Sequence, residues 1–574
     1  MSAEPVTRCA VRAGAYYDSV VLMQLQRALA TLPGVLDAGV VMATPANRDL
    51  LEASGLLPGS EIAAGPNDLL IAVKAESEAA AGEALARIDS LLQVRRAETG
   101  QDFRPRSLAS ALKQLPEARW VLVSVPGRYA ASVADEALDL GRNVFLYSDN
   151  VPLSEEVALK RKARERGLLV LGPDCGTAII GGTGFGFSNR VQPGEYGIIS
   201  ASGTGLQEVV CFLQGKNQGI SQAIGIGGRD LSAEVGGITA LQALDLLRRD
   251  PKTEAIVLIS KPPASEVAQR LISFAHATGK PTVVYFLGAP PVGRLQEVWF
   301  TRSLDSAADD VIELRYGKRS DWEDWPIHFP AGQRWVRGLF SGGTLALEVL
   351  RTLPALVSPV FSNLSYPGVH PLPDSAHSQG HTILDLGADE YTVGRLHPMI
   401  DFDLRLRRLK QEAADPEVAL LLLDVVLGDG AHADPAGELA PAIERAKADA
   451  KAAGRILDVA VVVVGTDLDP QDAKRQIATL KQSGAWVCRT VAHLVSYTVQ
   501  RLGEIRGDEI PPLEGRPVPL AAVSPPVAAI NVGLESFYDS LISQGARAVH
   551  VDWKPPAGGN EKMAGILARM KRSR

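Results

Sequence analysis

The regular alternation of short apolar runs with amphipathic helical patterns constrains the fold of this chain more than any other feature. Between residues 108 and 190, the apolar runs are 120–126, 143–149 and 168–174, and the helical patterns are 107–115, 130–141 and 154–167. Each run contains several consecutive apolar residues, which is typical of parallel strands buried on both faces. The alternation recurs at 194–315 and at 337–512. We therefore predict an α/β fold of tandem doubly wound parallel sheets.

Breaks in this pattern predict the domain boundaries. At 574 residues the chain is too long for one hydrophobic core. A small α/β pattern ends at a polar stretch near 97–107, a tryptophan-containing connector covers 315–335, and a proline-rich stretch follows residue 506. The predicted units are a small N-terminal α/β domain at 1–100, doubly wound units at 101–190, 191–330 (with the connector) and 331–512, and a C-terminal tail at 513–574.

Composition excludes several classes of function. A net charge of -7 does not attract nucleic acid or anionic lipid, and no run of about 18 apolar residues is present to span a membrane. The four cysteines form no CxxC pair and the nine histidines no HExxH motif, so neither a disulfide framework nor a metal site is predicted. We expect a cytoplasmic protein without nucleic-acid or membrane partners.

Two strand-to-helix turns are suited to binding an anion. In IISASGTGLQEVV and GLFSGGTLALEVL a strand runs through small residues directly into an amphipathic helix, which leaves main-chain N–H groups and the positive end of the helix dipole exposed. The alternative is that a hydroxyl merely caps each helix and the glycines permit a tight turn. The predicted phosphate-binding residues are Ser200, Ser202, Gly203 and Thr204 in the 200–205 turn and Ser341, Gly342, Gly343 and Thr344 in the 341–344 turn.

Other strand ends add candidate ligand-binding residues, because ligands of open parallel sheets bind at carboxyl strand ends. Lys261 follows one strand, as a cation that would lie near the same crevice. The candidate substrate-binding residues are Gly227, Gly228 and Arg229 in the middle unit and Asp385, Gly387 and Ala388 in the next. The glycines have an alternative role in close strand–helix packing.

Several motifs resemble those of succinyl-CoA synthetase. LGPDCGTAI, SASGTGLQE and IGIGGRD resemble, in order, motifs of its α subunit, and ILDLGAD stands in for a motif of its β subunit. The resemblance implies a Rossmann-like domain of the CoA-binding type at 101–190 and two flavodoxin-like ligase-type domains at 191–330 and 331–512. In that family the two helix starts contact the phosphate of a phosphohistidine from opposite sides.

Several of the motifs of succinyl-CoA synthetase are missing or altered in this chain. The stretch GRLQEVWFTRSLDSA has no histidine where the family places the phosphorylated one, and Lys261 replaces a glutamate. No glycine-rich CoA-binding turn lies in residues 1–100, and no nucleotide-binding domain is recognisable. The SKPP sequence and the tail, with INVGLESF and VDWKPPAGG, resemble the FdrA family, which is similar to a subunit of oxamate carbamoyltransferase of allantoin breakdown.

This resemblance implies three alternative functions. The first is a carbamoyltransferase subunit that works with separately encoded partner subunits, uses carbamoyl phosphate, needs neither CoA nor another cofactor, and has Lys261 as its catalytic residue. The second is an acyl-CoA synthetase whose histidine and nucleotide functions lie on another chain. The third is a non-catalytic scaffold subunit.

Overall fold

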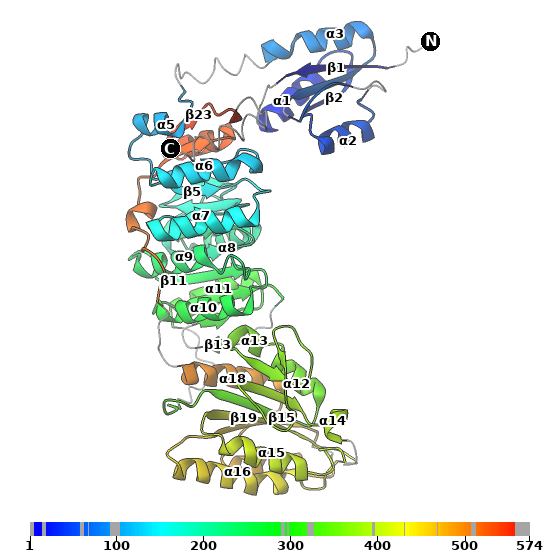
Figure 1. Ribbon diagram of the computed structural model, residues 1–574, viewed down its shortest axis with the longest axis vertical. Coiled ribbons are helices and arrows are strands. Elements are labelled where there is room, and N and C mark those ends of the chain that lie inside the picture. The colour runs from blue at the N-terminus through cyan, green and yellow to red at the C-terminus, as the bar shows by residue number, and fades with distance from the viewer. Residues whose placement is uncertain are drawn as a thin grey trace. The chain divides into compact units, whose positions relative to one another are not determined.

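A computed structural model describes residues 5–13, 19–57, 62–66, 68–91, 104–288, 293–295, 298–317, 327–392, 396–429, 431–467, 469–506 and 512–556. The central part of the predicted connector, 318–326, lies outside the described residues. The chain, whose helices and strands are drawn in Figure 1, divides into two units. The first comprises residues 1–159, 183–186 and 522–574, and the second comprises 160–182 and 187–521.

The first unit begins with a small antiparallel sheet covered by helices. Its strands are β1 (Val6–Arg12), β2 (Val35–Met42) and β3 (Leu69–Ala75), and their order is β1-β3-β2. Its helices are α1 (Ser19–Ala30), α2 (Pro45–Ala53) and α3 (Glu78–Ala86). Alternate residues of β3 point to opposite faces, so Ile71 packs in a cluster with Leu25 of α1, whereas Leu70 packs in a cluster with Leu51 of α2.

The parallel sheet of the first unit combines residues from both ends of the chain. Its strands β4 (Trp120–Val123), β5 (Asn143–Leu146), β22 (Ala528–Val532) and β23 (Arg547–Val551) lie in the order β23-β22-β4-β5, and all are parallel. Its helices are α5 (Leu108–Gln114), α6 (Gly127–Asp139) and α19 (Glu535–Ser543). The first unit also contains the short strand β8 (Thr183–Gly186). The Trp120 indole donates to the Ala522 carbonyl at 2.7 Å.

The C-terminal segment thereby completes this sheet. The chain leaves β22 through Gly533 and α19 toward β23, and leaves β4 through α6 toward β5. Gly533 has a φ of 122°, and a Cβ atom there would lie 2.5 Å from the main-chain carbon of Ser124. A strand–glycine–helix turn therefore lies beside β4 and comes from the predicted tail.

The second unit contains two sheets that follow one another along the chain. The first has the order β13-β14-β12-β11-β9-β10-β7, where only β7 and β13 are antiparallel to their neighbours. Its strands are β7 (Thr177–Ile180), β9 (Pro193–Ser200), β10 (Ile220–Gly225), β11 (Ala255–Ser260), β12 (Thr282–Phe286), β13 (Gly293–Leu295) and β14 (Val298–Phe300). Its helices are α8 (Gly203–Gly215), α9 (Ile238–Arg249), α10 (Ser265–Ala277) and α11 (Leu304–Arg315). Helix α7 (Leu153–Arg166) and β6 (Val170–Leu171) precede them.

The other sheet is parallel throughout, in the order β17-β16-β18-β15-β19-β20-β21. Its strands are β15 (Trp335–Phe340), β16 (Val360–Ser362), β17 (His370–Pro371), β18 (His381–Asp385), β19 (Val418–Val426), β20 (Asp458–Val464) and β21 (Trp486–Cys488). Its helices are α12 (Gly343–Leu350), α13 (Leu353–Leu356), α14 (Asp389–Thr392), α15 (Asp403–Ala414), α16 (Pro435–Ala452), α17 (Ala473–Gln482) and α18 (Val491–Arg506), and a 3-10 turn follows at Leu520–Val523. Figure 1 shows α15 and α16 on one face of this sheet and α12 and α18 on the other. The predicted doubly wound architecture is confirmed.

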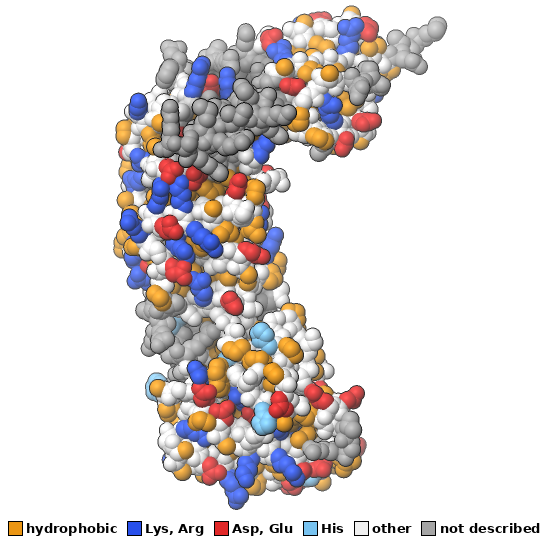
Figure 2. All heavy atoms as spheres, viewed as in Figure 1, with side chains coloured by type: hydrophobic (Ala, Val, Ile, Leu, Met, Phe, Trp, Pro, Cys, Tyr) orange, Lys and Arg blue, Asp and Glu red, His pale blue; other side chains and the backbone are white. Residues whose placement is uncertain are grey.

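Helix length and the distribution of surface charge can be compared with what the composition predicts. None of the helices in the described ranges is both long enough and apolar enough to cross a bilayer. On the face in Figure 2, lysine and arginine side chains are interspersed with aspartate and glutamate.

Candidate functional site

The 200–205 turn connects β9 to α8 and retains main-chain donors for a ligand. The Ser202 hydroxyl caps α8 by accepting from the Gly205 N–H at 3.2 Å, and the Ser202 N–H donates to the Ser200 hydroxyl at 3.0 Å. The capping alternative therefore describes Ser202 correctly. The N–H groups of Gly203 and Thr204 have no acceptor within the described part of the chain, so a helix start with two donors remains for an anion.

Two further predicted motifs pack around this turn. A Cβ atom on Gly203 would lie 3.8 Å from the Thr177 hydroxyl oxygen, and one on Gly228 would lie 3.9 Å from the Ala201 carbonyl oxygen. Gly227 has a φ of 84°, and a Cβ there would meet the Pro173 carbonyl oxygen at 2.5 Å. The motifs at 172–177, 200–205 and 225–228 thus come together at one edge of the sheet, while Arg229 is exposed.

A buried ion pair that no sequence motif indicates fixes the loop after β10. Lys160 and Asp230 are fully buried and 2.7 Å apart, and the Lys160 ammonium also donates to the Ile226 carbonyl at 3.0 Å. The Asp230 carboxylate accepts from the N–H groups of Thr239 and Ala240 at the start of α9. The helical pattern of 154–167 gave no signal for this role, because Lys160 reaches its partner across 70 residues of chain.

Lys261 follows β11, the strand beside β9. Ile259 of β11 pairs with Ser200 of β9, so Lys261 and Ser202 each lie two residues beyond a paired position at the same sheet edge. Lys261 is exposed. The positive end of the α8 dipole and the Lys261 ammonium at this sheet edge both favour a negatively charged ligand.

The 341–344 turn has a different chemistry, because a carboxylate of the chain already binds to it. Asp424, near the end of β19, is fully buried and accepts from the Ser341 N–H at 2.8 Å, the Ser341 hydroxyl at 2.9 Å and the Gly342 N–H at 2.9 Å. Buried Arg405 donates to the same carboxylate at 2.9 Å. The donors of this turn without an acceptor in the described residues are the N–H groups of Gly343 and Thr344.

Asp385 borders the same turn from the other side. It ends β18, where it pairs with Phe340, and a Cβ on Gly343 would lie 2.5 Å from its carboxylate. Burial raises the pKa of Asp385 and the charge of Asp424 adds to this rise, while the Gly387 N–H bond and the charge of His397 oppose it. The Gly387 N–H donates to Asp385 at 2.9 Å, and the Ala388 N–H donates to its carbonyl at 3.4 Å.

The two turns are therefore equivalent in topology and unequal in charge. Ser200 lies between Gly225 and Ile259, whereas the end of β15 lies between Asp385 and the Asp424 segment. The contacts described above for each turn come from its own sheet, so convergence of both on one phosphate stays a prediction. No group of three or more potential metal ligands occurs among the residues that the structure describes.

Comparison with known proteins gives the family. The protein YahF of Escherichia coli (strain K12) is 40% identical over 486 residues, which cover 83% of this chain and 94% of YahF. The chain belongs to the FdrA family of succinyl-CoA synthetase-like proteins. Family models match it at residues 3–106 (AllF, heavy metal-associated domain), 191–288 (CoA binding domain) and 339–497 (CoA-ligase).

More distant relatives of this FdrA-family chain are CoA ligases. The succinate–CoA ligase [ADP-forming] subunit alpha 1 of Archaeoglobus fulgidus is 29% identical over 180 residues, covering 30% of this chain and 60% of the relative. The solved dinucleotide-forming acetyl-coenzyme A synthetase 1 of Ca. Korarchaeum cryptofilum aligns over 68% of this chain and 83% of its own, at 17% identity and a TM-score of 0.29. The CoA-ligase family model and the relatives by sequence place the chain in an enzyme-like family of the acyl-CoA ligase kind.

Proposed function

We propose that this chain is a carbamoyltransferase subunit, similar to that of oxamate carbamoyltransferase, and that it binds the phosphate of carbamoyl phosphate at the 200–205 turn. The N–H groups of Gly203 and Thr204 at the positive end of α8 are the observation that supports this most directly. The absence of histidine from residues 293–307 argues for a donor that brings its own activated group. Lys261 would offset charge on the departing phosphate.

The charge difference between the turns supports a proposal for where each of the two substrates binds. A phosphate dianion beside the Asp385 carboxylate would be repelled, and Asp424 already binds two N–H groups of the 341–344 turn, so we place the phosphate on the 200–205 turn and the neutral amide group of the acceptor beside the 341–344 turn. The acceptor nitrogen forms a bond to the carbamoyl carbon, and the carbon–oxygen bond to phosphate breaks with its electron pair leaving on phosphate. Asp385, as a carboxylate, accepts the proton that the acceptor nitrogen loses.

The test of this proposal is Lys261→Ala in the complex assembled with its partner subunits. We expect kcat with carbamoyl phosphate to fall on the order of 10²-fold, because charge stabilisation of a leaving group is lost. Lys252→Ala is the matched control, since Lys252 is also exposed and lies before the same strand, at its opposite end. Turnover that Lys261→Ala leaves unchanged would reject the role of Lys261.

A second candidate function, an acyl-CoA synthetase subunit, has its own support. The CoA-ligase model matches residues 339–497, and β22, Gly533 and α19 supply a strand–glycine–helix turn beside β4. Calorimetry of the complex with CoA separates the candidates: saturable CoA binding favours the synthetase, and turnover of carbamoyl phosphate without CoA favours the transferase. Full activity after joint substitution of Gly203 and Gly343 would favour the scaffold function instead.

A further inference from the structure

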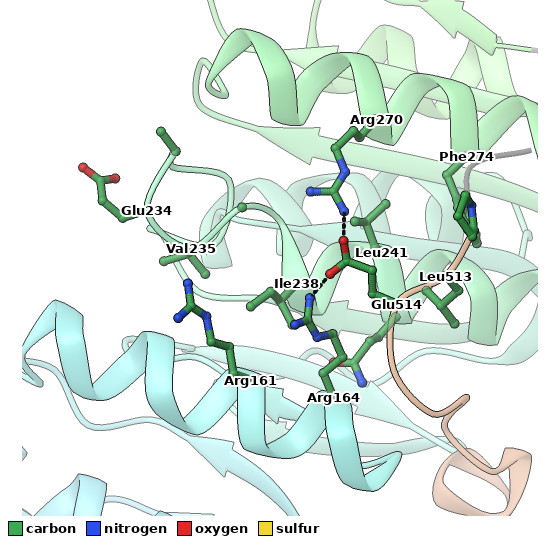
Figure 3. A pocket seen from close by; sticks show the side chains of 14 residues that line it. Arg161, Arg164, Glu234, Val235, Ile238, Leu241, Arg270, Phe274, Leu513 and Glu514 are labelled. Carbon is green, nitrogen blue, oxygen red and sulfur yellow. Dashed lines mark hydrogen bonds and ion pairs between the residues drawn. The ribbon is translucent and has the colours of Figure 1, made fainter.

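A cavity whose lining includes no residue of either turn has the chemistry of a binding site for an organic anion. It has a volume of about 400 Å³ and lies between α7, the start of α9, α10 and residues 512–514 (Figure 3). Three arginines line it, Arg161 and Arg164 from α7 and Arg270 from α10. The remaining lining is largely apolar, with Leu241 of α9 and Phe274 of α10 among it.

The positive charge of this cavity exceeds its negative charge. Glu514 bridges two of the arginines, forming an ion pair with Arg164 and lying 3.8 Å from Arg270 (Figure 3). The other acidic lining residue, Glu234, points away from the arginines in Figure 3. Arg161 has no ion-pair partner among the described residues, and the buried Nε of Arg164 has no hydrogen-bond partner there either. One carboxylate thus faces three guanidinium groups.

Guanidinium groups bind carboxylate and phosphate oxygens through paired N–H donors, and such pairs strengthen where water is partly excluded. Glu514 shows that the cavity accepts a carboxylate, and it is largely exposed, so its ion pairs are weak and can be replaced. We propose that this cavity binds a small organic oxyanion, whose carboxylate or phosphate pairs with Arg161 and Arg164 and whose apolar body lies against Leu241 and Phe274. The site is separate from the proposed carbamoyl transfer and does not depend on it.

Calorimetric titration of the full chain with phenyl phosphate and with benzoate tests this proposal, because the two probes share an apolar ring and differ in the anion. We expect saturable binding of at least one probe, weakened at least fivefold by Arg161→Gln combined with Arg164→Gln. Arg166→Gln is the matched control, because Arg166 is an exposed arginine of the same helix that does not line the cavity. Glu514→Gln should strengthen binding, since it removes the competing carboxylate.

These experiments distinguish binding in this cavity from binding at the 200–205 turn, which we also expect to bind phosphate. Binding of phenyl phosphate that the arginine variants leave unchanged, or the absence of binding by both probes in the wild type and in Glu514→Gln, overturns the proposal. Melting temperatures of the unliganded variants within about 2 °C of the wild type confirm that lost binding does not reflect lost folding.

Discussion

Asp424 determines what the 341–344 turn can bind. Its carboxylate occupies the N–H groups of Ser341 and Gly342, where a phosphate was predicted, and Arg405 neutralises it. The two donors that remain, on Gly343 and Thr344, lie beside the second carboxylate of Asp385. At the 200–205 turn, the residues that pair with Ser200 on the two neighbouring strands are the uncharged Gly225 and Ile259. Single side chains at strand ends thus make two similar backbones chemically different.

Substitution of Asp424 tests this arrangement. Asp424→Asn should lower the free energy of unfolding by about 3–5 kcal/mol, because it leaves the buried Arg405 without a charged partner. Denaturant titration measures the change, and the exposed Asp389→Asn serves as control. The double variant Asp424→Asn/Arg405→Met should be more stable than Asp424→Asn alone; equal stability of Asp424→Asn and the wild type would contradict the pairing.

The raised pKa of Asp385 predicts that folding stability changes with pH in the direction opposite to that for an ordinary paired carboxylate. Because its pKa is raised in the folded protein, the Asp385 carboxyl holds its proton more tightly there than in the unfolded chain. The stability that this group contributes is therefore lost as pH rises through the folded pKa. Asp385→Asn should therefore raise the melting temperature at pH 7, and the gain should shrink as pH falls toward 4. A gain that grows on acidification would show that the pKa is not raised.

At the scale of elements, the functional parts are turns between a strand and a helix. Each turn is shaped by what packs against it from the neighbouring strand end: the 172–177 segment against Gly225 and Gly227, and Asp385 against Gly343. The Lys160–Asp230 pair connects α7 to the start of α9 in the same way. A small residue in such a turn is required only where a neighbour is close.

The two glycines at the helix starts should therefore respond differently to alanine. Gly343→Ala should cost about 1–3 kcal/mol, because the new methyl group would lie 2.5 Å from the Asp385 carboxylate. Gly203→Ala should fold with unchanged or slightly higher stability, since its nearest neighbours are 3.8 Å away and alanine favours helix. Thermal unfolding measures both. In an Asp385→Ala background the cost of Gly343→Ala should disappear, and its persistence would assign the cost to another contact.

At the scale of the whole molecule, the C-terminal segment joins the sheet that contains β4 and β5. Residues 528–551 supply β22, which pairs with β4, and β23, which pairs with β22, and the Trp120 indole donates to the Ala522 carbonyl across 402 positions. The C-terminal segment is therefore part of a hydrophobic core, and its loss would expose β4.

Ile530 and Ile542 test this role of the C-terminal segment. Ile530 of β22 is fully buried, so Ile530→Ala should cost about 2–5 kcal/mol, whereas Ile542 of α19 is 45% exposed and Ile542→Ala should cost far less. Denaturant unfolding of the full chain compares them. Similar small effects of both substitutions would show that the segment contributes little to folding.

The sequence by itself determined the elements and their class, because side-chain periodicity and glycine-rich turns are local properties. The parallel sheets, the small residues of both turns and the position of Lys261 at a strand end were all predictable from neighbouring residues. Only the tertiary structure decided which strand ends lie side by side, since strand order depends on packing between distant segments. For this reason the position of β22 beside β4, the Lys160–Asp230 pair and the binding of Asp424 to Ser341, 83 residues away, could not be predicted.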